Sequence, residues 1–251
     1  MSHSVSLKAL RRKVAAIERR PAAVPAARAA LGVPAIDAAL GGGLARGRLH
    51  EMFAAAPGDA GAASGFAAML AARLGESAPI VWLRQDEAER AAHLHAPGLA
   101  ELGIDPARLV LGVAADPLML LRAAAEIVRC DEVGVAVIEL WRQPRPLDLT
   151  ASRRLAVAAE ASGVTALMLR IDAVPAPSAA HTRWQVAAAP SQPLEANAPG
   201  LPALDLTLLR QRGGSAGQRW RVAWDRDARA FAEAPLPGAV LPLAEHGSAA
   251  A

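Results

Sequence analysis

Residues 48–74, RLHEMFAAAPGDAGAASGFAAMLAARL, place a short apolar strand, a loop of small residues and a helix one after another. We expect the strand to end at Phe53 and the helix to start near Ser64. The loop AAAPGDAGAA stands where P-loop enzymes cradle phosphate with backbone amides, a lysine and a Ser/Thr hydroxyl. It has no lysine, since the chain's only lysines, Lys8 and Lys13, lie far upstream. The sequence therefore predicts a degenerate nucleotide site, without a cation for the phosphoryl group, at Gly58, Gly61, Ser64 and Gly65.

Two carboxylates extend this predicted site. Glu139 stands near the carboxyl end of the strand-like run GVAVIEL, residues 134–140, where nucleotide-binding proteins hold magnesium. Asp86 follows the strand-like residues WLR. Each has a structural alternative: Glu139 as a paired or surface glutamate, and Asp86 with Glu87 as an acidic pair at a helix N-terminus. We expect no catalytic residue, no metal site and no cofactor, and leave binding of ATP and magnesium as the alternative.

Short apolar runs alternate with longer helical stretches through the body of the chain. This alternation predicts an α/β fold with a mostly parallel sheet flanked by helices and buried on both faces. The expected strands are residues 48–53, 79–83, 109–113, 133–140 and 165–171, and the expected helices are residues 64–74, 87–102, 117–129 and 150–162. Residues 204–212 and 219–224 flank GGSAG and predict a β-hairpin.

The pattern divides the chain into four parts. Residues 1–25 contain a basic amphipathic arm, helical over residues 5–20, which must dock because so short a helix is marginal in water. The core is expected over residues 26–190, a C-terminal hairpin extension over residues 191–234, and a disordered tail over residues 235–251.

Composition narrows the class of protein. The 251 residues carry a net charge of +3, and no run reaches the ~18 apolar residues of a membrane helix. The N-terminus lacks the features of a secretion signal, so we expect a cytoplasmic protein. Cys130, the only cysteine, excludes an internal disulfide and is expected to be buried. His93 and His95 are expected on different faces of one helix and complete no metal site.

Two basic groups are candidate contacts for DNA or for a protein partner. Arg11, Arg12 and Lys13 belong to the arm. The second group lines the expected hairpin, where arginines can neutralise phosphates and a tryptophan can stack on bases: Arg210, Arg212, Arg219, Trp220 and Arg221. A solvated strand face with its tryptophan in the core is an equal alternative.

The order of these segments resembles the RecA superfamily. LGVPAIDAALGGGLARGRLHEMF, residues 31–53, resembles the segment leading into the phosphate loop, and PGLAELGIDPARLVL, residues 97–111, resembles the next helix-to-strand passage. GVAVIEL takes the place of the Walker B strand. Two further segments, residues 147–170 and SAAHTRWQVAAAPS at residues 178–191, are similar to the ImuA branch. The resemblance covers residues 31–224.

This resemblance implies a RecA-like core and a non-catalytic accessory role in SOS-induced translesion DNA synthesis and mutagenesis. The implied partners are an ImuB-like relative of Y-family polymerases and an error-prone replicative-type polymerase. RecA, DNA and a second copy of the chain are further candidates, and no membrane is involved. ATP-driven strand exchange is not expected, because the loop lacks the lysine and the following Ser/Thr of active RecA. The alternatives are a nucleotide-dependent recombinase-like ATPase and a SulA-like cell-division inhibitor.

Overall fold

A computed structural model describes residues 26–75, 77–193, 195–198 and 200–234. The strands are β1 (Arg28–Ala29), β2 (Leu44–Ala45), β3 (Leu49–Ala54), β4 (Ile80–Gln85), β5 (Leu109–Ala114), β6 (Val135–Trp141), β7 (Thr165–Ile171), β8 (Thr182–Ala189), β9 (Ala203–Gln211), β10 (Arg219–Asp225) and β11 (Ala230–Glu233). The helices are α2 (Pro34–Ala39), α3 (Ala60–Leu74), α4 (Asp86–Ala91), α5 (Ala96–Glu101), α6 (Pro117–Ile127) and α7 (Leu149–Ser162). The arm at residues 1–25 and the tail at residues 235–251 lie outside the described residues.

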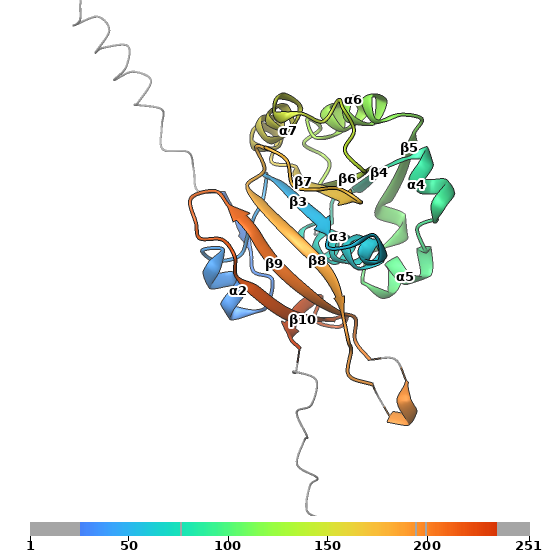
Figure 1. Ribbon diagram of the computed structural model, residues 1–251, viewed down its shortest axis with the longest axis vertical. Helices are drawn as coiled ribbons and strands as arrows, with labels where there is room; N and C mark the ends of the chain where they lie inside the picture. The colour runs from blue at the N-terminus through green and yellow to red at the C-terminus, as the bar shows by residue number, and fades with distance from the viewer. Residues whose placement is uncertain (1–25, 76, 194, 199, 235–251) are drawn as a thin grey trace, which may run out of the picture.

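The centre of the fold is a nine-stranded sheet in the order β11-β10-β9-β8-β3-β7-β6-β4-β5 (Figure 1). The strands from β8 to β5 pair in parallel, whereas β9, β10 and β11 continue the sheet antiparallel from β8. The predicted α/β fold with a mostly parallel sheet is confirmed. The predicted hairpin is also present, as the antiparallel pair β9 and β10.

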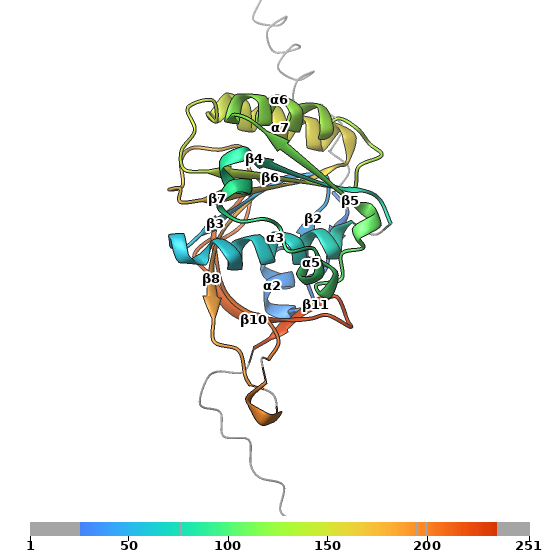
Figure 2. The ribbon, with the colours of Figure 1, turned by 90° about the vertical axis from the view of Figure 1, so that its right-hand side faces the viewer.

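Helices cover the two faces of the sheet in separate layers (Figure 2). Helices α6 and α7 lie on one face, and α3 and α5 lie on the other. The α3 side holds the larger aromatic core, in which the Phe66 ring contacts Trp184 and Phe231 with centroid distances of 6.0 and 5.6 Å. Most of α3 is alanine and glycine, so its axis can approach the sheet closely.

Three local expectations were wrong. The helix after β3 begins at Ala60 and not near Ser64, because a 3-10 turn over Pro57–Asp59 leads directly into it. The single helix expected over residues 87–102 is two short helices, and His93 and His95 lie in the non-helical link between them. His95 accepts a hydrogen bond from the Gly98 amide and so caps α5. Cys130 is exposed and not buried.

Helix α7 shows how the sequence sets an element's ends. Asp148 precedes it and accepts a hydrogen bond from the Ala151 amide at 2.7 Å, so it supplies the N-cap. Gly163 follows it with φ of 83°, a left-handed conformation that glycine adopts without strain. Among the described residues, no helix is both long enough and apolar enough to cross a lipid bilayer.

A buried hydrogen-bond chain runs through the α3 side of the sheet from β8 to β2. Trp184 donates its Nε1 hydrogen to Thr182 Oγ1 at 2.8 Å, and the Thr182 oxygen lies 2.7 Å from His50 Nδ1. His50 Nε2 lies 2.8 Å from the Ala45 carbonyl oxygen, which can only accept, so Nε2 carries the proton. Burial lowers the pKa of His50 from 6.5 to about 3, against the opposing effect of the Ala45 hydrogen bond. The chain therefore requires a neutral imidazole.

This neutral histidine predicts a loss of stability in mild acid. Unfolding exposes His50, so the chain takes up a proton on unfolding between the folded pKa of about 3 and the unfolded value of 6.5. Stability should fall as pH drops below 6.5, by up to ~1.4 kcal/mol per pH unit. Urea unfolding between pH 7 and 5 should show a smaller slope for His50→Gln than for the parent. Equal slopes for the parent and His50→Gln would contradict the assignment.

Candidate functional site at the carboxyl edge of the sheet

The carboxyl ends of the parallel strands bring most of the predicted nucleotide site to one edge. In open parallel sheets this edge is where ligands bind. Strand β3 ends at Ala54 and passes through the Pro57–Asp59 turn into α3, while β6 carries Glu139 toward the same edge. Strand β7 lies between β3 and β6.

The loop after β3 is closed by its own carboxylate. Asp59 accepts hydrogen bonds from the Ala56 amide at 3.1 Å and from the Ala188 amide of β8 at 2.8 Å. A phosphate-binding loop leaves such amides free for the anion, whereas a carboxylate here would repel one. A Cβ built on Gly58 or Gly61 would meet nothing within 4 Å, so the fold does not require glycine at these positions.

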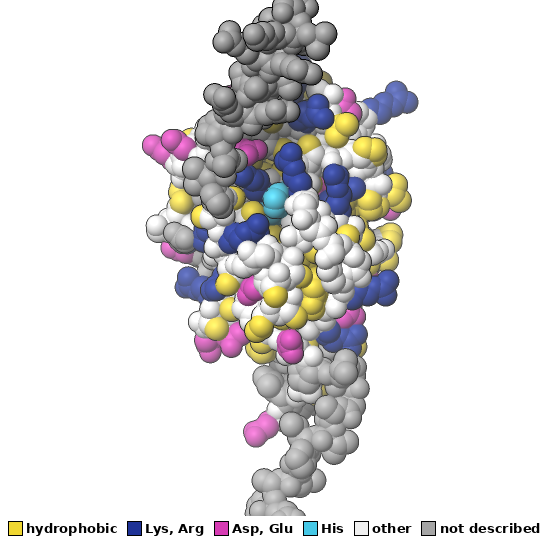
Figure 3. Space-filling view, turned by 90° about the vertical axis from the view of Figure 1, so that its left-hand side faces the viewer, with side chains coloured by type: hydrophobic (Ala, Val, Ile, Leu, Met, Phe, Trp, Pro, Cys, Tyr) yellow, Lys and Arg dark blue, Asp and Glu magenta, His cyan; other side chains and the backbone are white. Residues whose placement is uncertain are grey.

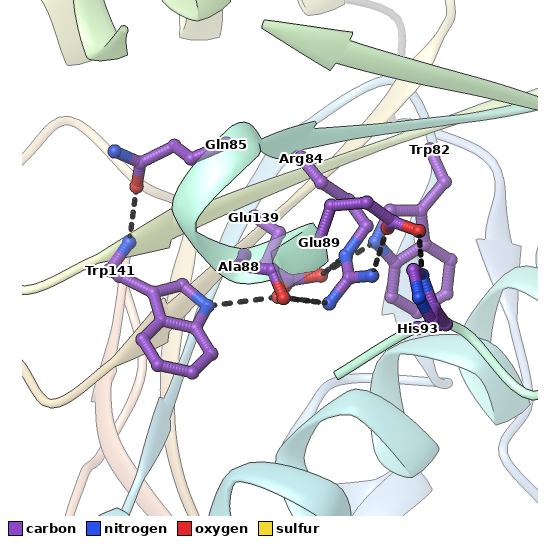
Figure 4. Close-up of polar contacts among 8 residues, drawn as sticks. All are labelled: Trp82, Arg84, Gln85, Ala88, Glu89, His93, Glu139 and Trp141. Carbon is purple, nitrogen blue, oxygen red and sulfur yellow. Dashed lines mark hydrogen bonds and ion pairs between the residues drawn. The ribbon is translucent and has the colours of Figure 1, made fainter. Parts of the chain in front are cut away.

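Glu139 is buried and fully hydrogen-bonded (Figure 4). Its Oε2 accepts from Trp82 Nε1 at 3.0 Å and from Arg84 Nε at 2.8 Å. Its Oε1 accepts from Trp141 Nε1 at 2.9 Å and from a terminal nitrogen of Arg84 at 3.2 Å. A carboxylate has about four lone-pair positions, so these four donors leave none facing a metal ion.

The cluster around Glu139 extends outward through Arg84. Arg84 also donates to Glu89 at 2.5 Å, and Glu89 pairs with His93 at 2.5 Å (Figure 4). The hydrogen bond with His93, followed by the charge of Arg84, lowers the pKa of Glu89 below its ordinary value. The result is a carboxylate and guanidinium network that holds β4, β6 and α4 together.

Asp86 does not join this network. It begins α4 and pairs with Arg90 at 2.6 Å across one helical turn, with its side chain 45% exposed. Glu87 forms a separate surface pair with Arg142 at 2.9 Å. The arrangement matches the acidic pair at a helix N-terminus that the sequence left as the alternative.

A cavity of about 710 Å³ brings four of the six predicted nucleotide-site residues together. Gly61, Ser64 and Gly65 of α3 form one wall, and Glu139 lies on another with Trp82. Gly58 and Asp86 do not line it. The remaining walls come mainly from apolar residues around α5 and at the adjoining ends of β8 and β9, and the lining also includes Arg84, His93, His95 and Glu101. Such walls, with the Glu139 lone pairs already used, suit an apolar group better than a magnesium triphosphate.

The predicted hairpin contacts separate into two groups. Trp220 packs toward the core with its ring centroid 6.1 Å from that of Trp184. Arg221 pairs through two hydrogen bonds of 2.7 Å with Asp205, which raises its pKa. Arg219 is exposed on the same strand, whereas Arg210 donates to the Ser178 carbonyl at 3.0 Å and lies with Arg212 beside α7. Arg11, Arg12 and Lys13 lie outside the described residues.

An apolar surface at the far edge of the sheet escaped the sequence analysis. Strand β5 ends the sheet and pairs only with β4 among the described strands. Three apolar side chains of β5 and two from the start of α6 are each at least 44% exposed: Val110, Leu111, Val113, Leu118 and Met119. We call this the β5 edge patch. The run LVLGVA was interpreted as a buried strand because apolar residues occupy both of its faces. An edge strand that pairs with another protein shows the same pattern.

Comparison with known proteins gives two kinds of relative. Two curated proteins named ImuA, from two strains of Caulobacter vibrioides, are each 34% identical to this chain over an alignment of 237 residues, and each match covers 88% of this chain and 91% of the relative. The crystal structure of the RadB recombinase superposes with a TM-score of 0.54 at 13% identity, over 82% of this chain and 99% of RadB. Against protein-family models the chain has no match. The likeness to RadB confirms a RecA-like fold.

Proposed function

The chain belongs to the ImuA family, and from this we propose that it is a non-catalytic RecA-like accessory protein in SOS-induced translesion DNA synthesis and mutagenesis. It acts as an adaptor for an ImuB-like relative of Y-family polymerases and an error-prone replicative-type polymerase. RecA is a further candidate partner. The protein works in the cytoplasm and needs neither ATP nor magnesium.

The chemistry of the carboxyl edge supports a non-catalytic role. Phosphoryl transfer depends on cations that neutralise the charge of the transferring group. The loop after β3 offers Asp59 in their place, and its helix begins with Ala60, Gly61, Ala62 and Ala63, which have no charged or hydroxyl side chain. Glu139, a buried carboxylate at this edge, is held by Arg84 and two tryptophans.

The β5 edge patch is the single observation that carries the adaptor role. An exposed edge strand presents unpaired N–H and C=O groups, and soluble proteins usually protect such edges with charges, proline or a bulge. Here Val110, Leu111 and Val113 are exposed instead. Partners of this kind of surface add a strand to the sheet and place side chains in pockets beside it. A polymerase relative that donates an extended apolar segment would complete β5.

Charges on the β5 edge patch should weaken partner binding. We expect Val110→Lys with Val113→Lys to weaken the affinity for the purified ImuB-like protein of the same genome by at least about tenfold, since interface anchors contribute over ~1.4 kcal/mol. Biolayer interferometry measures the change. Val174→Lys, at a 73% exposed loop valine, is the matched control and should bind like the parent. Parental affinity in the double variant, with both proteins folded, would remove the β5 edge patch from the proposal.

A further inference from the structure

A basic surface runs along α7 and the end of β9. Arg153 and Arg154 are exposed on α7, and Arg210 and Arg212 are exposed where β9 ends. Viewed from this side, Lys and Arg side chains surround a histidine (Figure 3). We call these four arginines the α7 track.

The charges of the α7 track are largely uncompensated. Within the described parts of the chain, Arg153, Arg154 and Arg212 form no ion pair. Glu160 of α7 is the carboxylate that lines the hollow between α7 and β9 in the described structure, and it is already paired with Arg48 at 3.3 Å. A surface of this kind attracts anions, because unpaired like charges sum to a positive potential.

Two hollows connect these arginines. A hollow of about 420 Å³ lies between α7 and β9, with Arg153 and Glu160 on one side, Arg210 and Arg212 on the other, and residues 178–180 as its floor. A second hollow of about 740 Å³ lies on the other side of Arg153 and is also lined by Arg154, by Asp131 and by Arg129, which is paired with Glu126 at 2.5 Å. Arg153 lines both, so the positive side chains follow one continuous concave path.

His181, which lies near the α7 track, is influenced by the charges of the surrounding arginines. Burial lowers the pKa of His181, and the charges of Arg48, Arg28 and Arg212 lower it further, with Glu160 alone opposing them. Burial first, and the nearby cations second, therefore favour the neutral imidazole. An anion bound among these arginines would reverse part of that effect.

We propose that the α7 track binds the phosphodiester backbone of a nucleic acid. Arginine guanidiniums match phosphate oxygens in geometry, and a series of them along a concave path fits a chain of regularly spaced phosphates. The described residues that line the two hollows include no aromatic side chain, so the track has no platform for base stacking and reads no sequence.

The α7 track is separate from the two surfaces discussed above. Five strands separate β9 from β5 in the sheet order, namely β8, β3, β7, β6 and β4. None of the four arginines lines the cavity beside α3. A protein partner at the β5 edge patch and a nucleic acid at the α7 track can therefore be held at the same time. The nucleic-acid site stands whether or not the adaptor role does.

Removing three arginine charges of the α7 track should weaken nucleic-acid binding far more than removing three exposed arginine charges elsewhere on the protein. The test uses the full chain, a fluorescein-labelled 24-nucleotide single strand and the duplex of the same length, and fluorescence anisotropy over a salt series. Arg153→Gln, Arg154→Gln and Arg212→Gln together should reduce affinity at least tenfold. The slope of log affinity against log salt should fall by about 2 for the single strand, at ~0.7 per lost contact. The two probes distinguish single-stranded from duplex nucleic acid as the source of the phosphates.

A matched control separates the site from net charge. Arg90→Gln, Arg122→Gln and Arg226→Gln remove the same charge from exposed arginines elsewhere and should bind like the parent. In the parent, saturating single strand should raise the pKa of His181 measured by NMR, and this rise should be lost in the α7 track variant. Equal loss of affinity in both triple variants would overturn the proposal. So would unchanged DNA binding with lost binding of polyglutamate, which would assign the surface to an acidic protein segment.

Discussion

Replacing Glu139 with glutamine is expected to destabilise the fold by about 3–5 kcal/mol, the usual cost of removing one partner of a buried ion pair. The Arg84 side chain is only 4% exposed, and the amide would leave Glu89, whose side chain is 21% exposed, as its remaining ion-pair partner among the described residues. The amide also replaces an acceptor for Trp82 or Trp141 with a donor. Urea unfolding measures the loss as a lower midpoint at an unchanged m-value.

Two further variants make the interpretation specific. Asp86→Asn breaks the exposed pair with Arg90 and should cost under ~1 kcal/mol. Glu139→Gln combined with Arg84→Met removes both charges and should recover much of the loss, because an apolar side chain of similar length tolerates burial better than a guanidinium without the Glu139 charge. If Glu139→Gln were as stable as the parent and instead abolished a measurable ATP turnover, Glu139 would be a magnesium ligand and the non-catalytic proposal would fail.

The closed state of Glu139 links stability to the proposed function. A carboxylate that binds magnesium needs oxygen lone pairs that are free of other hydrogen bonds. It is also destabilised by repulsion from any neighbouring carboxylate. Here Arg84, Trp82 and Trp141 satisfy Glu139 completely, so the same position joins β4 to β6. The mainly apolar cavity beside it and the Asp59 carboxylate in the loop are consistent with a structural role for this edge of the sheet and not with nucleotide hydrolysis.

Much of the parallel sheet could be predicted because its central strands are buried on both faces. The expected strand at residues 165–171 coincides with β7, and the others agree within a few residues. Strand β8 was missed because TRWQVAAA mixes polar and small residues and shows no apolar run. The break between α4 and α5 was missed although Pro97, two residues after the capping His95, is a helix-start signal.

The candidate site was less predictable because its contacts join distant segments. Arg84 and Glu139 are 55 residues apart, and only the adjacency of β4 and β6 brings them together. A lone arginine in the apolar run IVWLRQ does indicate a buried partner, but not which one. Trp220 was a candidate DNA contact, yet it alternates with Arg219 and Arg221 and shares its inward face with Val222 and Trp224.

A second buried carboxylate predicts an effect of the same size on the opposite face of the sheet. Glu51 is 1% exposed, accepts from Ser178 Oγ at 2.6 Å and pairs with Arg183 at 2.8 Å. Arg183 and Arg170 lie over the Phe53 ring, with their guanidinium carbons 5.1 and 5.6 Å from its centroid. Burial lowers the pKa of Arg170, Glu51 opposes this, and Arg183 adds to it. One carboxylate thus balances two buried guanidiniums.

Glu51→Gln should therefore destabilise the protein by about 3–5 kcal/mol, because both guanidiniums would lose their shared counter-charge. Chemical unfolding of three variants separates charge from hydrogen bonding. Ser178→Ala removes only the hydroxyl donor and should cost about 1 kcal/mol. Glu51→Gln with Arg183→Met leaves one buried cation in place of two and should be more stable than Glu51→Gln alone. Arg183 has a buried terminal nitrogen without a partner in the described structure, so its removal forfeits little hydrogen bonding. A loss below 1 kcal/mol for Glu51→Gln would mean that the balance of charges does not hold this face together.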